Sequence, residues 1–511
     1  MVRWHDDQRA RRPTGSWTHC LYSSDIWLEV TIQDDVDHGN FEDQAEPQKT
    51  IDVQVTIRPR SIVQTAPSGY WTIRLTLGVV EQPLAVCFVE PIAKQIRPED
   101  LYSPEELKEK VYYVDPERDF PLNLDQVTQP IIYFRPGIYA MAWNYHAYLP
   151  NQVEWIYLAP GSYVKGAFQF RGETGKTPNH LRVTGAGTLS GEKYVYECDK
   201  ENGYRTRPAD LPGGAYEGRC LKMLEFWSPA DMEPPGRVQG ITLTNPQFHT
   251  FTVYGTLDSK DAKFATQVNQ YHMVGTWYFQ TDGLEVPSFS CLEHSFFQSG
   301  DDCIKLYWSD VTVRNITCWF QGNGGLVQFG WKPRNLARVL CEKIQVIHDL
   351  SRFRGASNCA IICGADLIVD SDKHEAHHYT IEDLTLRDIQ VEGRCMCPIR
   401  IVVQSKIQKI KIENLFVEMW DGSEDQCTLR NFDKNLQLLK GNPHVTDYFK
   451  NIEESFLEIL NFRLGKEPVA RSNAESLGRL NFDSGLHGGV GRRERGVPVP
   501  NGNSPEVGCG R

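Results

Sequence analysis

The amino-acid sequence predicts an all-β protein whose main domain is a parallel β-helix, a solenoid of short strands. A pattern of strand, polar residue and strand recurs at intervals of roughly 20 to 30 residues, which is typical of solenoids. The strand-like stretches are separated by turns that contain Gly and Pro rather than by helices. At 511 residues the chain exceeds an ordinary globular domain, whereas a solenoid reaches that length as one unit.

The N-terminal part of the chain is expected to form a small β-sandwich. Short antiparallel strands are predicted by alternating apolar and polar residues at 26–32, 51–57 and 71–77. Residues 93–125 are charged and contain proline, with one helix-like patch at 105–110, and are interpreted as a linker. Residues 1–120 are therefore assigned to a sandwich-like domain and its linker.

Beyond about residue 130 the pattern becomes that of a solenoid. Residues 131–139 and 155–164 each read as a strand, a Pro-Gly turn and a second strand. The polar break between two strands then recurs at Asn245, Asn315, Lys343, Asp388 and Asn414. Asn315 and Lys343 are 28 residues apart, and Asp388 and Asn414 are 26 residues apart. These intervals are the expected length of one coil.

A parallel β-helix explains these intervals better than other repeat folds. Each coil lays its strands against the previous coil, so that inward Val, Ile and Leu form one continuous core. A leucine-rich repeat would need a helix in each repeat, and a propeller would need four strands joined by hairpins in roughly 40–45 residues. Residues 121–483 are assigned to the β-helix, and the Gly-, Arg- and Pro-rich residues 484–511 to a disordered tail.

The bulk composition argues against several classes of function. A net charge of −12 argues against a nucleic-acid partner, because phosphate binding needs a basic surface. No apolar run reaches the roughly 20 residues that a membrane-spanning helix needs, so no membrane association is expected. The first residues carry charges where a signal peptide would have its apolar stretch, so no signal peptide is recognised.

Two possible metal-binding patterns are weighed and set aside. Cysteines at 359, 363, 395 and 397 are candidates for disulfides, buried thiols or metal ligands, but they lack the paired Cys-x2-Cys spacing of a zinc site. Residues 374–378 read His-Glu-Ala-His-His, a metalloprotease-like string whose chemistry needs a helix. A strand-like stretch follows immediately, so these residues are interpreted as a solvated loop and no metal is expected.

Three aspartates in mid-solenoid are the candidate catalytic residues. Asp282 precedes Gly283, and Asp301 and Asp302 follow Gly300, 19 and 20 residues later. Because that interval is slightly less than one coil and neighbouring strands lie about 4.8 Å apart, the three carboxylates are expected on one face. Crowded carboxylates repel and raise one another's pKa, which gives a hydrolase one protonated acid and one ionised base.

An ordinary turn is the alternative explanation of the same residues. Asp-Gly and Gly-Asp-Asp are favoured in turns by local hydrogen bonding. Adjacent residues of a strand also point to opposite faces, so Asp301 and Asp302 face one substrate only where the chain bends. Gly300 is the expected position of that bend.

Longer blocks around these aspartates resemble glycoside hydrolase family 49, the dextranase and isopullulanase family. The resemblance lies in 280–285 (Gln-Thr-Asp-Gly-Leu-Glu), 300–307 (Gly-Asp-Asp-Cys-Ile-Lys-Leu-Tyr), 327–335, 157–167, 187–192 and 473–479. It implies an N-terminal β-sandwich, a right-handed parallel β-helix and inverting hydrolysis. At the matching positions it implies Asp301 as general acid, with Asp282 and Asp302 holding the attacking water.

The resemblance also implies a polysaccharide substrate, an α-glucan, and no cofactor. Dextran with its α-1,6 bonds is the first expectation, and isopullulanase-type cleavage of α-1,4 bonds in pullulan is the second. Residues expected to bind the substrate are Lys305, Trp277, Tyr278, Tyr307 and Trp331. The chain is expected to be a monomer and, by resemblance, extracellular.

Two other functions are weighed against this one. A polygalacturonase-like enzyme shares the Asp-Gly and Gly-Asp-Asp arrangement, but its pattern continues with Gly-His-Gly and then Arg-x-Lys, which grips substrate carboxylates. This chain has Gly-Asn-Gly-Gly at 322–325 and no Arg-x-Lys soon after, which favours a neutral glucan. A non-catalytic carbohydrate-binding β-helix would keep the aromatic residues but has no use for three crowded aspartates.

Overall fold

The structure, a computed structural model, describes residues 16–22, 53–60, 69–77, 80–91 and most of 96–464. Within the last range the gaps are 118, 120–121, 143–144, 172–180, 209–217, 229–235, 256–265, 277, 279, 286–287, 322, 332–333, 350–358, 367–378, 404, 421–427, 432–436 and 441–456. The strand predicted at 26–32, the string at 374–378 and the tail at 484–511 lie outside the described residues.

The described N-terminal strands form one four-stranded sheet. The strands are β1 (Ser16–Tyr22), β2 (Val53–Arg60), β3 (Gly69–Leu77) and β4 (Val80–Pro91), in the order β1-β4-β3-β2. The pairs β2–β3 and β3–β4 are antiparallel, as expected, whereas β1 joins β4 in parallel. A sandwich needs two sheets, whereas the described residues of this region form a single sheet, so the sandwich stays a prediction.

Residues 93–125 do more than link two domains. They include the short helices η2 (Pro98–Asp100) and α1 (Pro104–Lys110), and the helix-like patch is thereby confirmed. Ser103 caps α1, since its hydroxyl accepts the Glu106 amide while the Glu106 side chain returns to the Ser103 amide. Strand β5 (Val111–Val114) already pairs with the first coil, so the solenoid begins before the predicted boundary at 121.

An 11-stranded sheet forms one wall of the solenoid. All its neighbouring strands are parallel except the terminal pair β33–β34. The strands, in order, are β8 (Ala147–Leu149), β11 (Phe168–Arg171), β16 (Leu224–Ser228), β19 (Phe251–Gly255), β22 (Leu284–Glu285), β24 (Ile304–Lys305), β26 (Gly325–Trp331), β28 (Ala360–Asp366), β30 (Ile399–Val403), β33 (Thr428–Asn431) and β34 (Gln437–Lys440).

A 19-stranded sheet forms the remaining walls as two ladders of short strands that merge. One ladder contains β5, β6 (Ile131–Phe134), β9 (Trp155–Leu158), β12 (Arg182–Gly185), β17 (Arg237–Gln239) and β20 (Gln267–Asn269). The other contains β7 (Gly137–Ala140), β10 (Ser162–Lys165), β13 (Thr188–Ser190), β18 (Thr242–Thr244) and β21 (His272–Val274). They merge in β23 (Cys291–Ser299), followed by β25 (Thr312–Phe320), β27 (Leu336–Asp349), β29 (Thr380–Cys395), β31 (Lys406–Ile407), β32 (Ile410–Trp420), β35 (Leu457–Leu460) and β36 (Arg463–Leu464).

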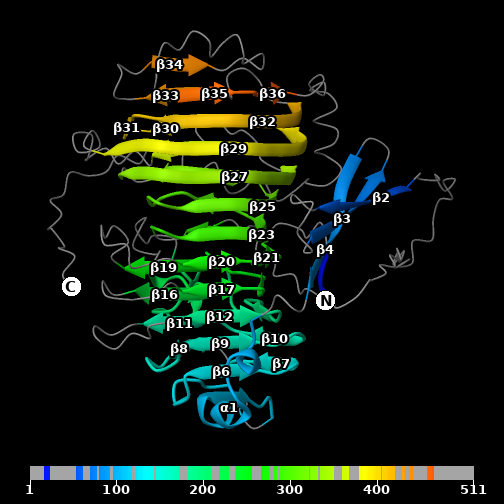
Figure 1. Ribbon diagram of the computed structural model, residues 1–511, viewed down its shortest axis with the longest axis vertical. Helices are drawn as coiled ribbons and strands as arrows, with labels where there is room; N and C mark the ends of the chain where they lie inside the picture. The colour runs from blue at the N-terminus through cyan, green and yellow to red at the C-terminus, as the bar shows by residue number, and fades with distance from the viewer. Residues whose placement is uncertain are drawn as a thin grey trace.

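This topology confirms the predicted parallel β-helix. From β22 to β31 the chain alternates between a strand of the 11-stranded sheet and a strand of the 19-stranded sheet. Figure 1 shows the coils stacked from α1 at one end to β34 at the other. A separate two-stranded hairpin, β14 (Cys198–Asp199) and β15 (Arg205–Thr206), is inserted between β13 and β16.

The predicted polar breaks are the points where the long strands bend. Asn315, Lys343, Asp388 and Asn414 lie in register on successive coils and all have φ between 55° and 57°. Asn and Asp adopt this left-handed conformation more readily than most residues. Asn245 also has positive φ but follows β18, and Gly240 takes the bend position on that coil. The prediction is therefore confirmed at four positions and wrong at Asn245.

The interior of the solenoid is a set of stacked apolar columns. One residue per coil fills each column, and the side chains are almost completely buried. One such column contains Val183, Val238, Val268, Leu292, Val313, Cys341, Leu386 and Ile412. Burial of each apolar side chain of this size contributes roughly 1.5–3 kcal/mol, so the column is a main source of stability.

The cysteines add to this interior. The ten cysteines whose side chains the structure describes form no disulfide, and those at 359, 363, 395 and 397 are buried thiols. In the same part of the chain no helix is long and apolar enough to cross a membrane.

The residues at which the long strands bend give the first testable prediction. Asn414 donates its side-chain amide to Asp388 (2.7 Å) and accepts the amide of Asn461 (3.0 Å). Replacing Asn414 with Val removes these bonds and places a β-branched residue at φ 55°, at a cost of about 1–2 kcal/mol for the backbone alone. Asn414→Gly loses only the bonds. Urea unfolding is expected to show a lower midpoint for Val than for Gly; equal midpoints would contradict the argument.

Candidate active site

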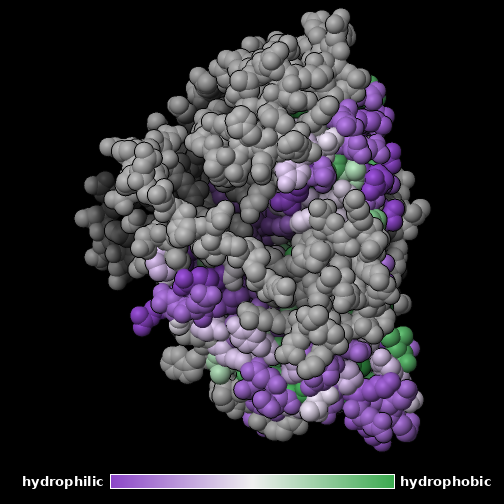
Figure 2. Space-filling model, turned by 90° about the vertical axis from the view of Figure 1, so that its left-hand side faces the viewer, coloured by the Kyte–Doolittle hydropathy of each residue, from purple (hydrophilic) through white to green (hydrophobic). Residues whose placement is uncertain are grey.

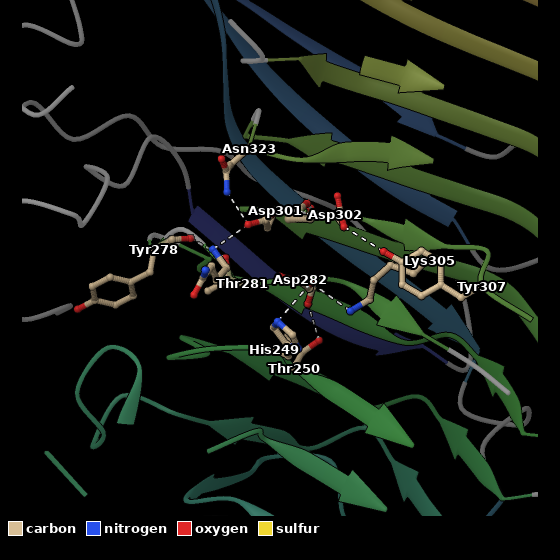
Figure 3. Close-up of polar contacts among 12 residues, drawn as sticks. His249, Thr250, Tyr278, Thr281, Asp282, Asp301, Asp302, Lys305, Tyr307 and Asn323 are labelled. Atoms are coloured by element: carbon tan, nitrogen blue, oxygen red, sulfur yellow. Dashed lines mark hydrogen bonds and ion pairs between the residues drawn. The ribbon is translucent and has the colours of Figure 1, made fainter. Parts of the chain in front are cut away.

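The three predicted aspartates come together where β22 and β24 enter the 11-stranded sheet. Leu284 pairs with Ile304, so Asp282 lies opposite Asp302 on the next coil. The hydrogen bond from the Gly283 amide to the Asp302 carbonyl (2.7 Å) fixes this register. Neighbouring strands lie about 4.8 Å apart, which places two carboxylates side by side. Figure 3 shows Asp301 beside this pair.

The chain bends between Asp301 and the strand before it, as the sequence predicts. Strand β23 ends at Ser299, and residues 300–301 form a bend before β24 begins. A Cβ atom on Gly300 would lie 2.2 Å from the Thr281 hydroxyl and 2.3 Å from the Tyr278 carbonyl, so only glycine fits. The bend lets Asp301 and Asp302 reach the same cluster although they are adjacent.

Asp301 is held by amide donors. Its Oδ2 accepts the Gln280 amide (3.2 Å) and the side-chain amide of Asn323, and its Oδ1 accepts the Asp302 amide (2.9 Å). Burial, together with the negative charges of Asp282 and Asp302, raises the pKa of Asp301 well above its usual value. A carboxyl in this environment keeps its proton at a pH where an exposed aspartate has lost it.

Asp302 has a different set of partners. Its Oδ1 accepts the Gly325 amide (2.7 Å) and its Oδ2 accepts the Tyr307 hydroxyl (3.2 Å). Burial and the charge of Asp282 raise the pKa of Asp302 to about 7, while the Gly325 amide, Lys305 and Tyr307 oppose that rise. Asp302 therefore changes charge near neutral pH, together with its neighbours.

Asp282 forms an ion pair with a lysine side chain. Its Oδ2 lies 3.1 Å from the Lys305 ammonium and 3.3 Å from His249 Nε2. Burial alone would lower the pKa of Lys305, but the charges of Asp282, Glu285 and Asp302 outweigh it and raise that pKa. Asp282 is thus paired with a full positive charge on the next coil (Figure 3).

His249 and Asn323 are site residues that the sequence reasoning missed. Burial, with the positive charges of Lys305 and Lys222, holds the pKa of His249 well below its usual value. The imidazole is therefore neutral and has one N–H to donate, and its Nε2 faces Asp282. His249 precedes Asp282 by 33 residues, the same interval as Phe251 to Leu284 in the sheet. That interval differs from the 20 residues of the next coil, so no regular spacing in the sequence indicates the pairing.

The predicted substrate-binding residues occupy varied positions. Lys305 and Tyr307 contact the aspartates directly. Tyr278 is 6% exposed, stacks on Tyr196 at 4.9 Å between ring centroids, and points away from the carboxylates in Figure 3. Tyr307 is 5% exposed, so in this structure neither tyrosine presents an open ring face to a sugar, contrary to expectation. Trp277 and the side chain of Trp331 lie outside the described residues.

The surface of the solenoid is hollowed on the side seen in Figure 2. Hydrophilic side chains gather inside a depression at mid-height of that face. Asp282 and Asp302 themselves are buried, with 8% and 5% exposure. Burial of these carboxyl groups strengthens the electrostatic effects between them and the charged groups beside them.

Comparisons with known proteins agree with this geometry. Residues 370–491 match the sequence model of glycosyl hydrolase family 49. Over 92% of its length the chain is 33% identical to a dextranase of Arthrobacter sp. (strain CB-8), of which it covers 77%. The chain belongs to glycosyl hydrolase family 49. It is therefore a glycoside hydrolase, as the sequence resemblance implies.

Two further proteins are similar to this chain, one in sequence and one in structure. An isopullulanase of Aspergillus niger is 27% identical over 92% of this chain and 81% of its own. The solved structure of Dex49A from Penicillium minioluteum matches with a TM-score of 0.60 at 21% identity, covering 85% of this chain and 76% of that one. At that identity the structural match supports the fold alone.

A glycine beneath the carboxylates gives the second prediction. Gly324 has φ +79°, and a Cβ there would lie 2.3 Å from Oδ1 of both Asp301 and Asp302. Gly324→Ala is expected to displace both carboxylates and abolish most hydrolytic activity. Gly393→Ala is the matched control, since Gly393 has φ +70° and nothing within 4 Å of such a Cβ. Thermal unfolding and activity are measured for both; an equal loss of activity would contradict the prediction.

Proposed function

We propose that this glycoside hydrolase cleaves an α-glucan internally and with inversion, acting on the α-1,6 bonds of dextran. The observation that carries the proposal is the cluster of three carboxylates with different environments on adjacent coils. The higher identity to a dextranase than to an isopullulanase supports dextran. Cleavage of α-1,4 bonds in pullulan, favoured by the isopullulanase relative, is the second candidate. A polymer of this kind is met outside the cell, where we propose that the protein acts.

In the proposed reaction Asp301 is the general acid. Among the described residues no ion pair of Asp301 is found like that of Asp282 with Lys305, and its raised pKa keeps it protonated. Asp301 gives its proton to the glycosidic oxygen as the bond from that oxygen to the anomeric carbon breaks. The leaving sugar takes the proton, and the amides of Gln280 and Asn323 then stabilise the carboxylate that remains.

Asp282 and Asp302 hold the attacking water. One of them removes a proton from the water while the water oxygen bonds to the anomeric carbon from the face opposite the leaving group. The product therefore has inverted anomeric configuration, for which acid and base carboxyl groups lie about 6.5–9.5 Å apart. Oδ1 of Asp301 and Oδ1 of Asp302 are closer than that here, since both lie 2.3 Å from the same Cβ position on Gly324. Substrate binding is therefore expected to separate them or to leave Asp282 as the base. No cofactor enters this reaction.

Lys305 and His249 support Asp282 in this role. The Lys305 ammonium, 3.1 Å away, stabilises the ionised form of Asp282, and Nε2 of the neutral His249 lies 3.3 Å from the same oxygen. Because Lys305 is already paired with Asp282, it does not offer a free charge to an acidic substrate. This pairing favours a neutral glucan over polygalacturonate.

The function is tested by incubating the purified protein separately with dextran, pullulan and polygalacturonate and following new reducing ends. Release from dextran is expected, with β-anomeric product first by proton NMR. Asp282→Asn, Asp301→Asn and Asp302→Asn are each expected to lower the rate roughly 100- to 10,000-fold with the fold intact.

Asp383→Asn is the control, because Asp383 lies on the surface and pairs with Lys409. Release from pullulan alone would move the activity to the second candidate. Near-full activity in any of the three site variants would remove that residue from the mechanism.

The raised pKa of Asp302 predicts a pH-dependent effect on stability. The folded carboxyl holds its proton up to about pH 7, whereas the unfolded one releases it near its usual 3.8. Folded protein therefore binds more protons between these values, and its stability falls as the pH rises through them. Asp302→Asn removes this effect and is expected to be more thermostable than the wild type at about pH 8.

At about pH 4 both proteins carry a neutral side chain at position 302, so the difference in melting temperature is expected to shrink. Melting curves at the two pH values check this. A difference that is the same at both would show that the ionised carboxylate is not the cause.

A further inference from the structure

A hairpin inserted between two coils lies against the outer face of the 11-stranded sheet. We call residues 191–208, which contain β14 and β15, the hairpin segment. Cys198 pairs with Thr206 and Asp199 with Arg205. The segment has its own small apolar cluster, in which Tyr194 and Cys198 pack with Ala167 and Leu221. It is thus a built element of the fold.

The outward residues of the 11-stranded sheet form a polar column that reaches the active site. In strand register the column contains Gln169, Glu225, Thr252, Glu285 and Lys305. The residues beside them in each strand, such as Phe168 and Leu224, point into the core. Lys305 contacts Asp282, so a linear chain that binds over Lys305 and follows this column runs along the solenoid.

The hairpin segment covers the N-terminal end of this column. Lys200 forms an ion pair with Glu225 at 2.9 Å, and the two side chains are only 6% and 1% exposed. Glu225 accepts the side-chain amide of Gln169 (2.9 Å), and Gln169 lies 3.0 Å from His146 Nε2. The Tyr204 hydroxyl reaches the other nitrogen of that imidazole at 2.6 Å. Lys200 thereby covers Glu225 directly, and Tyr204 is linked to Gln169 through His146.

The same segment is also fixed beside the catalytic coil. The Tyr196 ring stacks on Tyr278 with an interplanar angle of 17°, and the Glu197 amide donates to the Gln247 carbonyl (3.0 Å). At its start, the Lys193 ammonium donates to the carbonyls of Met141 (2.7 Å) and Ala142 (3.2 Å). Removal of one partner of the buried Lys200–Glu225 pair would strongly destabilise the fold, so this pair and the contacts of Tyr196, Glu197 and Lys193 hold the segment in place.

We propose that the hairpin segment closes the N-terminal end of the polar column over which the glucan binds and sets the length of the product on that side. From Lys305 to Glu225 the column crosses three strand spacings, about 14 Å. A glucan that extends from the cleavage point towards this end meets Lys200 and Tyr204 there. This inference rests on the proposed function, because it concerns how the same site holds its glucan.

The test uses linear α-1,6-linked gluco-oligosaccharides of defined length, labelled at one end. Early products are separated by chromatography for the wild type and for the triple variant Lys200→Ala/Tyr204→Ala/Glu225→Gln. The variant removes the two covering side chains and leaves no unpaired charge on residue 225. The wild type is expected to leave a short product of narrow length range on one side of the cut. The variant is expected to lengthen that product by at least one glucose unit.

Tyr204→Ala alone is a second variant, which removes one of the two side chains that a glucan meets at this end and keeps the ion pair of Lys200 with Glu225 intact. It decides the question if the triple variant does not fold, and the same lengthening is expected. Glu201→Ala is the matched control, because Glu201 belongs to the hairpin segment but its side chain is 67% exposed. Its product lengths are expected to equal those of the wild type.

Folded variants that hydrolyse dextran and give wild-type product lengths would overturn the inference and leave the proposed function standing. Absence of hydrolysis by the wild type on dextran and on pullulan would instead overturn the proposed function. Reducing ends released from the polymer are therefore measured first, and product lengths second.

Discussion

The register between adjacent coils is the constraint on which the site depends. Once Leu284 pairs with Ile304, Asp282 and Asp302 are fixed side by side at about the strand spacing. Carboxylates at this distance repel one another, and burial adds to the cost of charging them. The stacked apolar columns of the solenoid supply the stability that makes this arrangement tolerable. The fold thus holds together groups that would otherwise separate.

The neighbours of each carboxyl then give the three aspartates different properties. Asp282 faces an ammonium and a neutral imidazole, whereas Asp301 and Asp302 are held by neutral amide and hydroxyl donors. Positive charge favours the ionised form, and burial beside negative charge favours the protonated form. One cluster of identical residues therefore contains both an acid and a base, which is what hydrolysis with inversion needs.

Insertions between the coils decide what surrounds this cluster. A solenoid has a long outer face, and nothing in its regular coils stops a bound linear polymer at a particular position. The hairpin segment occupies part of that face through the buried pair of Lys200 and Glu225. The coils thus provide the chemistry, and the segments between them shape the space in which a substrate lies.

The sequence by itself determined the solenoid, the bend at Gly300, the polar breaks and the three aspartates, because each depends on residues close together in the chain. The tertiary structure alone decided the partnership of Asp282 with His249, the contact of Asn323 with Asp301 and the orientation of Tyr278. Coil lengths change from 33 to 20 to 23 residues between β19 and β26, so no fixed interval predicts which residues meet. Proximity across coils is set by hydrogen-bonded register, and register becomes visible only when the strands are paired.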